Sequence, residues 1–174
     1  MLTRMRRPSV IASFLFALTV MVSVTAAAQD RVADFSFRAI DGPPVTSESL
    51  RGEVVVLAFG ASWLPLTRNQ MEAVKKLADQ YAGRGVAVYW VSTESESPKS
   101  KNYASDEQLR ELGRKYKATV LRDPDGVVSK KLGVDQLPSV VIIGKQGNIR
   151  DTMGGMDPNA NLATQLAARL DKIL

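Results

Sequence analysis

Two residue types that carry much of protein chemistry are missing from this sequence of 174 residues, which has no cysteine and no histidine. Without cysteine the chain can form no disulfide and no thiolate nucleophile, and without histidine it lacks the most common general base. A Ser-His-Asp triad and a zinc site of cysteine and histidine ligands are therefore excluded. We expect neither a metal nor a cofactor.

A strong charge of one sign is also missing. The chain has 23 basic and 18 acidic residues, a net charge of +5. Three arginines lie before residue 29, so residues 29–174 hold 20 basic and 18 acidic residues, a net charge of +2. Proteins that bind nucleic acid usually gather their basic residues in one patch, whereas the lysines here are interleaved with acids. We therefore predict no nucleic-acid partner.

The N-terminal residues have the organisation of an export signal. A basic start (Arg4–Arg7) precedes an apolar run of 15 residues (Val10–Val24), and Ala26–Ala28 fits a small-residue cleavage site. The apolar run is shorter than the roughly 20 residues that a membrane span needs. We predict a signal peptide over 1–28, a single domain over 29–174, and a periplasmic or secreted protein. The alternative is an uncleaved N-terminal anchor, the only membrane contact we expect.

Beyond the signal, patterns typical of strands and helices alternate. A near-continuous apolar run, Val54–Phe59, is typical of a strand buried on both faces. Met71 and Leu77 belong to an apolar face with helical spacing. We predict strands at 34–39, 45–46, 53–59, 86–91, 120–122, 139–143 and 149–152, and helices at 67–82, 105–116, up to 132, and from Asn159 or Asn161. This order predicts an α/β fold whose mixed central sheet carries helices on both faces.

Three segments in this order resemble the thioredoxin superfamily. Val54–Phe59 and the following Trp63-Leu64-Pro65-Leu66-Thr67-Arg68 are similar to the strand and the Trp-Cys-Pro-x-Cys-Arg motif of that superfamily. Leu137-Pro138 resembles the segment that holds its cis-proline, and 143–149 resembles its closing hairpin. Together with the export signal, these segments are similar to the TlpA-like periplasmic redoxins, which are thiol:disulfide oxidoreductases. The resemblance covers about residues 33–174 and implies a thioredoxin-like fold with a cis bond before Pro138.

The sequence departs from the family at the two positions that carry its chemistry. Leu64 and Thr67 stand where the family has its cysteines. Leucine is no nucleophile, and the Thr67 hydroxyl has no histidine or other obvious base nearby to activate it. We therefore expect no catalytic residue and no dithiol exchange by this chain alone. Oxidoreductase activity would be an assignment by family and not by mechanism.

The resemblance also implies a groove beside the motif and the cis-proline, in which an extended peptide binds by backbone hydrogen bonds. The residues that we expect to line it are Trp63, Leu64, Pro65, Leu66, Thr67, Leu137 and Pro138. Because leucine replaces cysteine at position 64, this groove is more apolar than in the family. We predict an extended peptide or another envelope protein as its partner. The alternative is that Leu64 and Leu66 only pack the remnant of a lost active site.

Other functions remain open from the residues alone. The chain could be an oxidoreductase whose thiols come from a partner, or an enzyme in which the Thr67 hydroxyl acts on a bound thiol. For Thr67 itself we favour an ordinary helix N-cap over a role in binding. Asp123 and Asp125, in Asp-Pro-Asp-Gly, resemble a calcium loop only distantly, and we favour a turn there.

Overall fold

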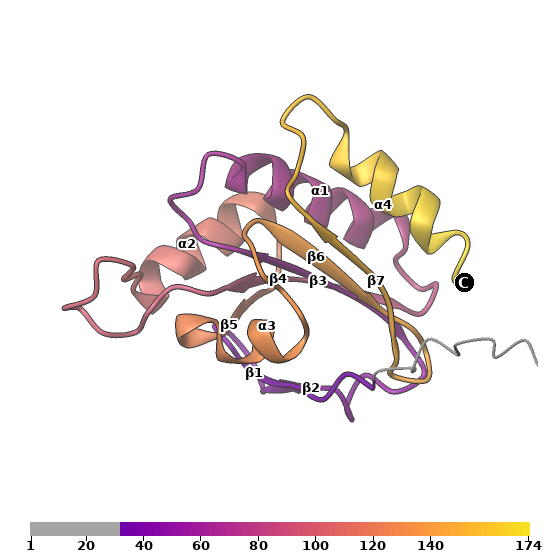
Figure 1. Ribbon diagram of the computed structural model, residues 1–174, viewed down its shortest axis with the longest axis horizontal. Coiled ribbons are helices and arrows are strands. Elements are labelled where there is room, and N and C mark those ends of the chain that lie inside the picture. Colours follow the sequence, from indigo (N-terminus) through magenta and orange to yellow (C-terminus); the bar gives the residue numbers. More distant parts are fainter. Residues whose placement is uncertain (1–31) are drawn as a thin grey trace, which may run out of the picture.

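The computed structural model describes residues 32–174, so the predicted signal peptide and the first residues of the predicted domain lie outside it. Seven strands form one sheet in the order β2-β1-β5-β4-β3-β6-β7 (Figure 1). Their bounds are β1 Ser36–Ala39, β2 Val45–Thr46, β3 Val54–Gly60, β4 Val86–Ser92, β5 Val120–Arg122, β6 Ser139–Ile143 and β7 Ile149–Gly154. β3, β4 and β5 are parallel to one another, and the other neighbouring pairs are antiparallel. The predicted mixed sheet is confirmed.

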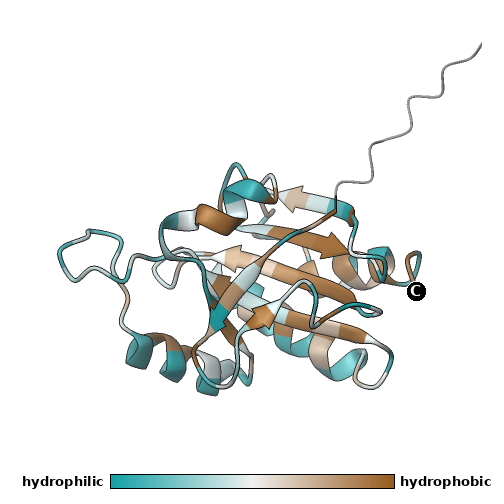
Figure 2. Cartoon of the chain, turned by 90° about the horizontal axis from the view of Figure 1, so that it is seen from below, coloured by the Kyte–Doolittle hydropathy of each residue, from teal (hydrophilic) through white to brown (hydrophobic). Residues whose placement is uncertain are grey.

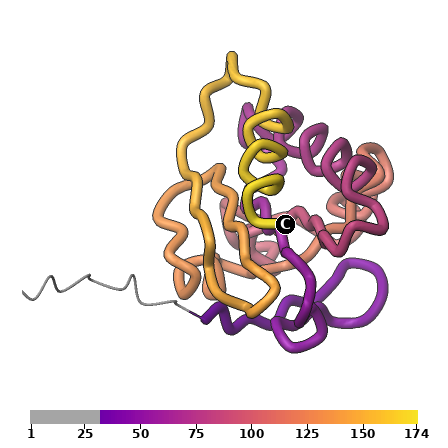
Figure 3. The backbone as a smooth tube through the Cα atoms, turned by 90° about the vertical axis from the view of Figure 1, so that its right-hand side faces the viewer, coloured from indigo at the N-terminus to yellow at the C-terminus, as the bar shows by residue number. Residues whose placement is uncertain are grey.

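The helices cover both faces of the sheet, as predicted. They are α1 Thr67–Gln80, α2 Asp106–Tyr116, α3 Val127–Lys131 and α4 Leu162–Leu170, with a 3₁₀ turn at Pro124–Gly126 before α3. Figures 1 and 3 show α4 lying beside α1 on one face, while α3 lies on the other. Within residues 32–174 no helix has both the length and the apolar character that crossing a membrane requires.

The central strand β3 divides the interior into two cores. All seven of its residues are buried. Val56 packs in the core under α1 and α4, whereas its neighbour Leu57 packs in the core on the side of α3. This alternation follows from the period of two in a strand, and it confirms the prediction of a strand buried on both faces. Figure 2 shows the apolar residues concentrated in the strands and the hydrophilic ones on the outer surfaces.

Two helix starts follow local capping rules. The amide of Gln108 donates to the Ser105 hydroxyl at 3.2 Å, and the Ser105 amide donates to the Gln108 side chain at 2.8 Å. This reciprocal capping box confirms Ser105 as the cap of α2. The Asn161 side chain accepts from the Thr164 amide at 3.1 Å, so the last helix starts after Asn161 and not after Asn159.

A buried glutamine ties three strands to the first turn of α1. The side-chain amide of Gln70 donates to the carbonyl oxygens of Phe59 in β3 (3.0 Å) and Ser139 in β6 (3.2 Å). Its oxygen accepts from the Trp90 indole in β4 at 2.8 Å. Because Gln70 and Trp90 are fully buried, these bonds satisfy polar groups that water cannot reach. Trp90 is therefore a core residue.

Paired charges hold the connection between β4 and α2, residues 93–105, against the sheet. The guanidinium of Arg122 is buried, and it donates to the Ala104 carbonyl at 2.9 Å and to the Glu94 carbonyl at 3.3 Å. Arg38 donates to Asp106 at 2.8 Å and to Glu96 at 2.6 Å. This 93–105 loop, which projects at the left of Figure 1, is therefore anchored at both of its ends.

We expect Gly60→Ala to destabilise the protein. A Cβ at position 60 would lie 2.6 Å from the Gln70 side-chain oxygen and 3.1 Å from the Trp90 indole nitrogen. Overpacking of this kind typically lowers the free energy of unfolding by about 1–3 kcal/mol. Urea unfolding measures this free energy. In a Gln70→Ala background the shorter of these two contacts is gone while the contact with Trp90 stays, so the same substitution should cost less. An equal cost in both backgrounds would show that contact with Gln70 is not the cause.

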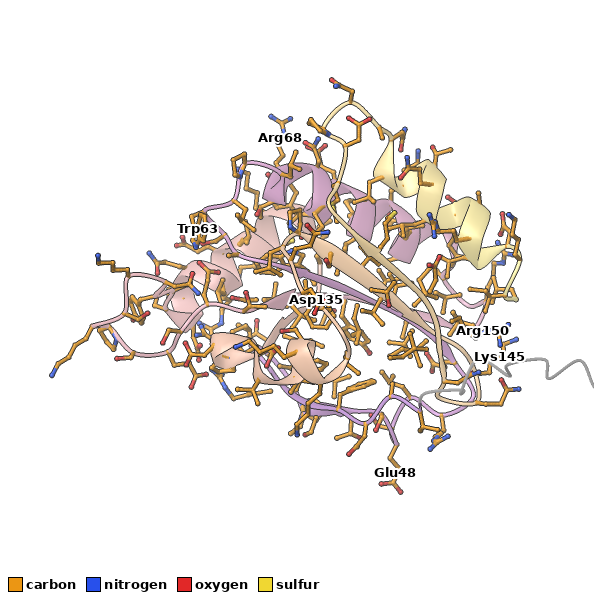
Figure 4. The ribbon with its side chains drawn as sticks, viewed as in Figure 1. Glu48, Trp63, Arg68, Asp135, Lys145 and Arg150 are labelled. Atoms are coloured by element: carbon orange, nitrogen blue, oxygen red, sulfur yellow. The ribbon has the colours of Figure 1, made fainter. Side chains whose placement is uncertain are left out.

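Acid should weaken the protein partly through Asp106. The hydrogen bond from Arg38 lowers the pKa of Asp106 below its ordinary value. The charged form of Asp106 therefore adds stability above the pKa of an unfolded aspartate, about 3.9, and this is lost as the pH falls through the lower folded pKa. Asp106→Asn should lower the urea midpoint at neutral pH and bring little change near pH 2. Glu48→Gln is the control, since Glu48 forms no ion pair within residues 32–174 and points away from the molecule (Figure 4). If Asp106→Asn lowered the urea midpoint equally at neutral pH and near pH 2, the charge of Asp106 would not be the cause.

Candidate functional site

The candidate site lies at one edge of the sheet, where four connections meet. The carboxyl ends of the parallel strands β3, β4 and β5 share this edge, and the antiparallel β6 begins there. Crevices at the carboxyl ends of parallel strands are common ligand sites in α/β proteins. The segments that follow β3, β4 and β5 and the one that precedes β6 therefore form the site together.

The motif after β3 forms tight turns that lead into α1. The Leu64 amide donates to the Ala61 carbonyl at 3.0 Å, and the Thr67 amide donates to the Leu64 carbonyl at 3.1 Å. Leu66 is the N-cap of α1 and makes no side-chain capping bond. The N-cap alternative for Thr67 is therefore wrong, because Thr67 is the first helical residue.

Thr67 lies under the motif and not at its surface. It is 4% exposed, and its hydroxyl donates to the Ala61 carbonyl at 2.5 Å. A hydroxyl that gives its proton to a carbonyl oxygen gains no nucleophilic character, because a carbonyl is no general base. Thr67 therefore helps to hold the turns of the motif.

A buried carboxylate supports the motif from behind, and sequence reasoning missed it. Glu94 is 1% exposed and is the second residue after β4. It accepts from the Ser62 amide at 2.9 Å, from the Ser62 hydroxyl at 2.6 Å and from the Ser92 hydroxyl at 2.9 Å. These three bonds attach the residue before Trp63 to the end of β4. In sequence, Glu94 looks like any acid of a polar loop, and no local signal marks its burial.

Trp63 stands out of the surface in a defined orientation. It is 63% exposed, and its indole N–H donates to the Asn102 side-chain oxygen at 2.8 Å. Asn102 belongs to the 93–105 loop, and its side-chain amide donates to the Thr93 carbonyl at 3.4 Å. Figure 4 shows Trp63 on the side of the molecule from which this loop projects.

A groove of about 510 Å³ lies beside Trp63. We call it the Trp63–Leu137 groove, and its lining residues are Trp63, Leu64, Thr93, Asn102, Asp125, Gly126, Ser129, Lys130, Val134, Asp135, Gln136 and Leu137. Its volume is in the range of small-ligand sites.

Only some of the residues that we predicted to line the groove do so. These residues are Trp63, Leu64 and Leu137. Of the other four predicted residues, Pro65 is exposed, Leu66 is half-buried, and Thr67 and Pro138 are buried; none of them is in the wall.

The segment before β6 supplies the end of the groove opposite the motif. The peptide bond between Leu137 and Pro138 is cis, as the resemblance predicted. Leu137 is 37% exposed. In the described part of the chain, no hydrogen bond uses its amide or its carbonyl. Both groups are therefore available to an added strand.

The groove also carries charged residues that the prediction did not include: Asp125, Lys130 and Asp135. Asp125 and Asp135 come from connections and Lys130 from α3, all far along the chain from the motif, so local spacing held no signal for them. The neighbouring Asp123 accepts from the Val128 and Ser129 amides at 2.7 Å each. It caps α3, as expected of a turn. No cluster of three or more potential metal ligands is found among residues 32–174.

Comparisons with known proteins agree with this architecture. The chain is similar to the Thioredoxin-like protein YneN of Bacillus subtilis, with 30% identity over 122 residues, which are 68% of this chain and 66% of YneN, just under two thirds of its length. It is 29% identical to the Thiol:disulfide interchange protein DsbE of Pseudomonas aeruginosa, over 79% of this chain and 75% of that protein. The exposed lipoprotein thioredoxin Etrx1 of Streptococcus pneumoniae superposes with a TM-score of 0.62 and 26% identity, covering 79% of this chain and 99% of that one.

These relatives confirm the thioredoxin-like fold. In addition, the model of the AhpC/TSA family matches residues 28–152, which is more than half of the chain. The motif strand, the motif and the cis-proline all lie inside that match, and the chain has no cysteine in it. The chain therefore belongs to the AhpC/TSA family, as a member without cysteine.

Proposed function

We propose that this protein is an exported, redox-inactive member of its family that binds extended polypeptide segments in the Trp63–Leu137 groove. The observation that carries the proposal is a groove that keeps a protruding tryptophan and free strand-pairing groups although the chain has no cysteine. Thiol chemistry needs a thiolate, and this chain can supply none.

The exposed indole supports a binding role. Exposed aromatic side chains fixed at a concave surface are typical of protein-binding sites, where tryptophan often supplies much of the affinity. The bond to Asn102 orients the Trp63 ring before any partner arrives, which reduces the entropy that binding must offset. At the other end, the Leu137 amide and carbonyl can pair with a partner backbone in the manner of an added strand.

An envelope location supports the same role. The predicted signal peptide directs the chain out of the cytoplasm, and the pneumococcal relative is described as an exposed lipoprotein. Polypeptides that have not yet folded expose extended apolar segments, and such segments fit this groove. An enzyme that uses the Thr67 hydroxyl is the weaker candidate, because that hydroxyl is buried and bonded to a carbonyl.

Restoring the cysteines tests the absence of redox chemistry. We expect the wild type to leave the reduction of insulin by dithiothreitol unaccelerated. Leu64→Cys/Thr67→Cys should accelerate it, because the pair restores a dithiol at the N-terminal end of α1, with one cysteine in the turns before the N-cap Leu66 and the other at the first helical position. Leu64→Cys alone is the matched control and should stay inactive in turnover, since it has no resolving thiol. Acceleration by the wild type would contradict the proposal.

Removing the indole tests the binding role. Trp63→Ala should weaken binding of reduced, carboxymethylated lysozyme at least about tenfold, the usual effect of losing a tryptophan hot spot. Isothermal titration calorimetry measures the affinity. Val32→Ala is the control, because Val32 is similarly exposed at 57% and lies outside the groove. Equal affinities of the wild type, Trp63→Ala and Val32→Ala would show that Trp63 does not contribute to binding. Absence of binding by the wild type would overturn the proposed function.

A further inference from the structure

The Trp63–Leu137 groove combines apolar walls with two unpaired carboxylates. Leu64, Val134 and Leu137 provide apolar surface beside Trp63. Asp125 and Asp135 are both exposed, and no ion pair within residues 32–174 uses either of them. Figure 4 shows Asp135 near the middle of the molecule, away from Trp63. Because both acids line the same groove as Trp63 and Leu137, a segment bound along this groove would lie close to them.

The lysine in the lining does not neutralise these acids. The Lys130 ammonium donates to the backbone carbonyl of Asp125 at 3.3 Å, and no ion pair in the described chain joins it to a carboxylate. Among the described lining residues the balance is two carboxylates against one ammonium. The groove is therefore locally acidic, although residues 29–174 together carry +2.

We propose that the groove selects extended segments in which a large apolar side chain is flanked by lysine or arginine. This inference rests on the proposed function and adds the chemistry of the partner. The apolar side chain packs against Trp63, Leu64 and Leu137, and the flanking cation pairs with Asp125 or Asp135. The two carboxylates come from different connections, one before α3 and one before the cis-proline, so the groove offers a flanking cation two separate partners.

The overall charge of the protein makes this preference distinctive. A chain with net positive charge attracts anionic peptides and repels cationic ones over distances up to the Debye length, about 10 Å at 0.1 M salt. A preference for cations must therefore arise in the groove itself. General electrostatic attraction and the proposed selection predict opposite orders of affinity.

Three peptides test the inference, of the form acetyl-Gly-X-Leu-Phe-Leu-X-Gly-amide with X as lysine, glutamine or glutamate. Affinities are measured by calorimetry and by the fluorescence of Trp63, with buried Trp90 as a constant background. We expect the lysine peptide to bind about three- to tenfold more tightly than the glutamine peptide, and the glutamate peptide to bind most weakly. The difference should shrink in about 0.5 M salt, which screens exposed charges.

Charge-neutral variants locate the effect. Asp125→Asn/Asp135→Asn should remove the preference, so that on this variant the lysine peptide binds no more tightly than the glutamine peptide. Asparagine suits position 125, where φ is +60°, because it tolerates left-handed backbone. Glu48→Gln removes one acid far from the groove and should keep the full preference.

The outcomes separate the two proposals. Equal binding of all three peptides, or tightest binding of the glutamate peptide, overturns the selection of cations while peptide binding itself stands. Persistence of the lysine preference in the double variant also overturns it, because the acids named here would then not be responsible. Failure of every peptide to bind overturns the proposed function as well.

Discussion

One neutral amide holds the site end of this molecule together. The Gln70 side chain is fully buried and bonds to Phe59 in β3, Trp90 in β4 and Ser139 in β6. Since a buried polar group needs its partners, α1 cannot slide along the sheet without losing all three bonds. α1 begins at Thr67, and Ser139 directly follows the cis-proline. The same amide therefore keeps the motif and the cis-proline segment next to each other.

None of the contacts that place the groove requires sulfur. Glu94 holds Ser62, Asn102 orients Trp63, and the Thr67 hydroxyl bonds to the Ala61 carbonyl. The contacts that shape the groove therefore remain in a chain that has no thiol. Leu64 lies half-buried in the wall, where it adds apolar area beside the indole. A family scaffold of this kind separates the recognition of a polypeptide from the chemistry performed on it.

Charge is arranged in two different ways on the two sides of the 93–105 loop. On one side, Arg38 and Arg122 pair with Glu96 and Asp106 and hold the loop against the sheet. On the other, the acids of the groove stay unpaired within the described chain. Exposed ion pairs add little stability individually, whereas carboxylates without partners are available to a ligand. The first arrangement serves the fold and the second the proposed binding.

Local pattern is enough to predict most elements of this fold. The apolar run of β3, the helical spacing of Met71 and Leu77, and the capping residue Ser105 act over a few residues, and a linear sequence displays such relations directly. Composition alone likewise excludes dithiol exchange, because the chain has no cysteine. The remaining features depend on distance in space. Glu94, Asn102, Asp125 and Asp135 meet the motif because parallel β3, β4 and β5 end at the same edge where β6 begins. Because these residues are far apart in the chain, the sequence does not show that they lie close together. Only the order of the strands in the sheet brings their connections to one place.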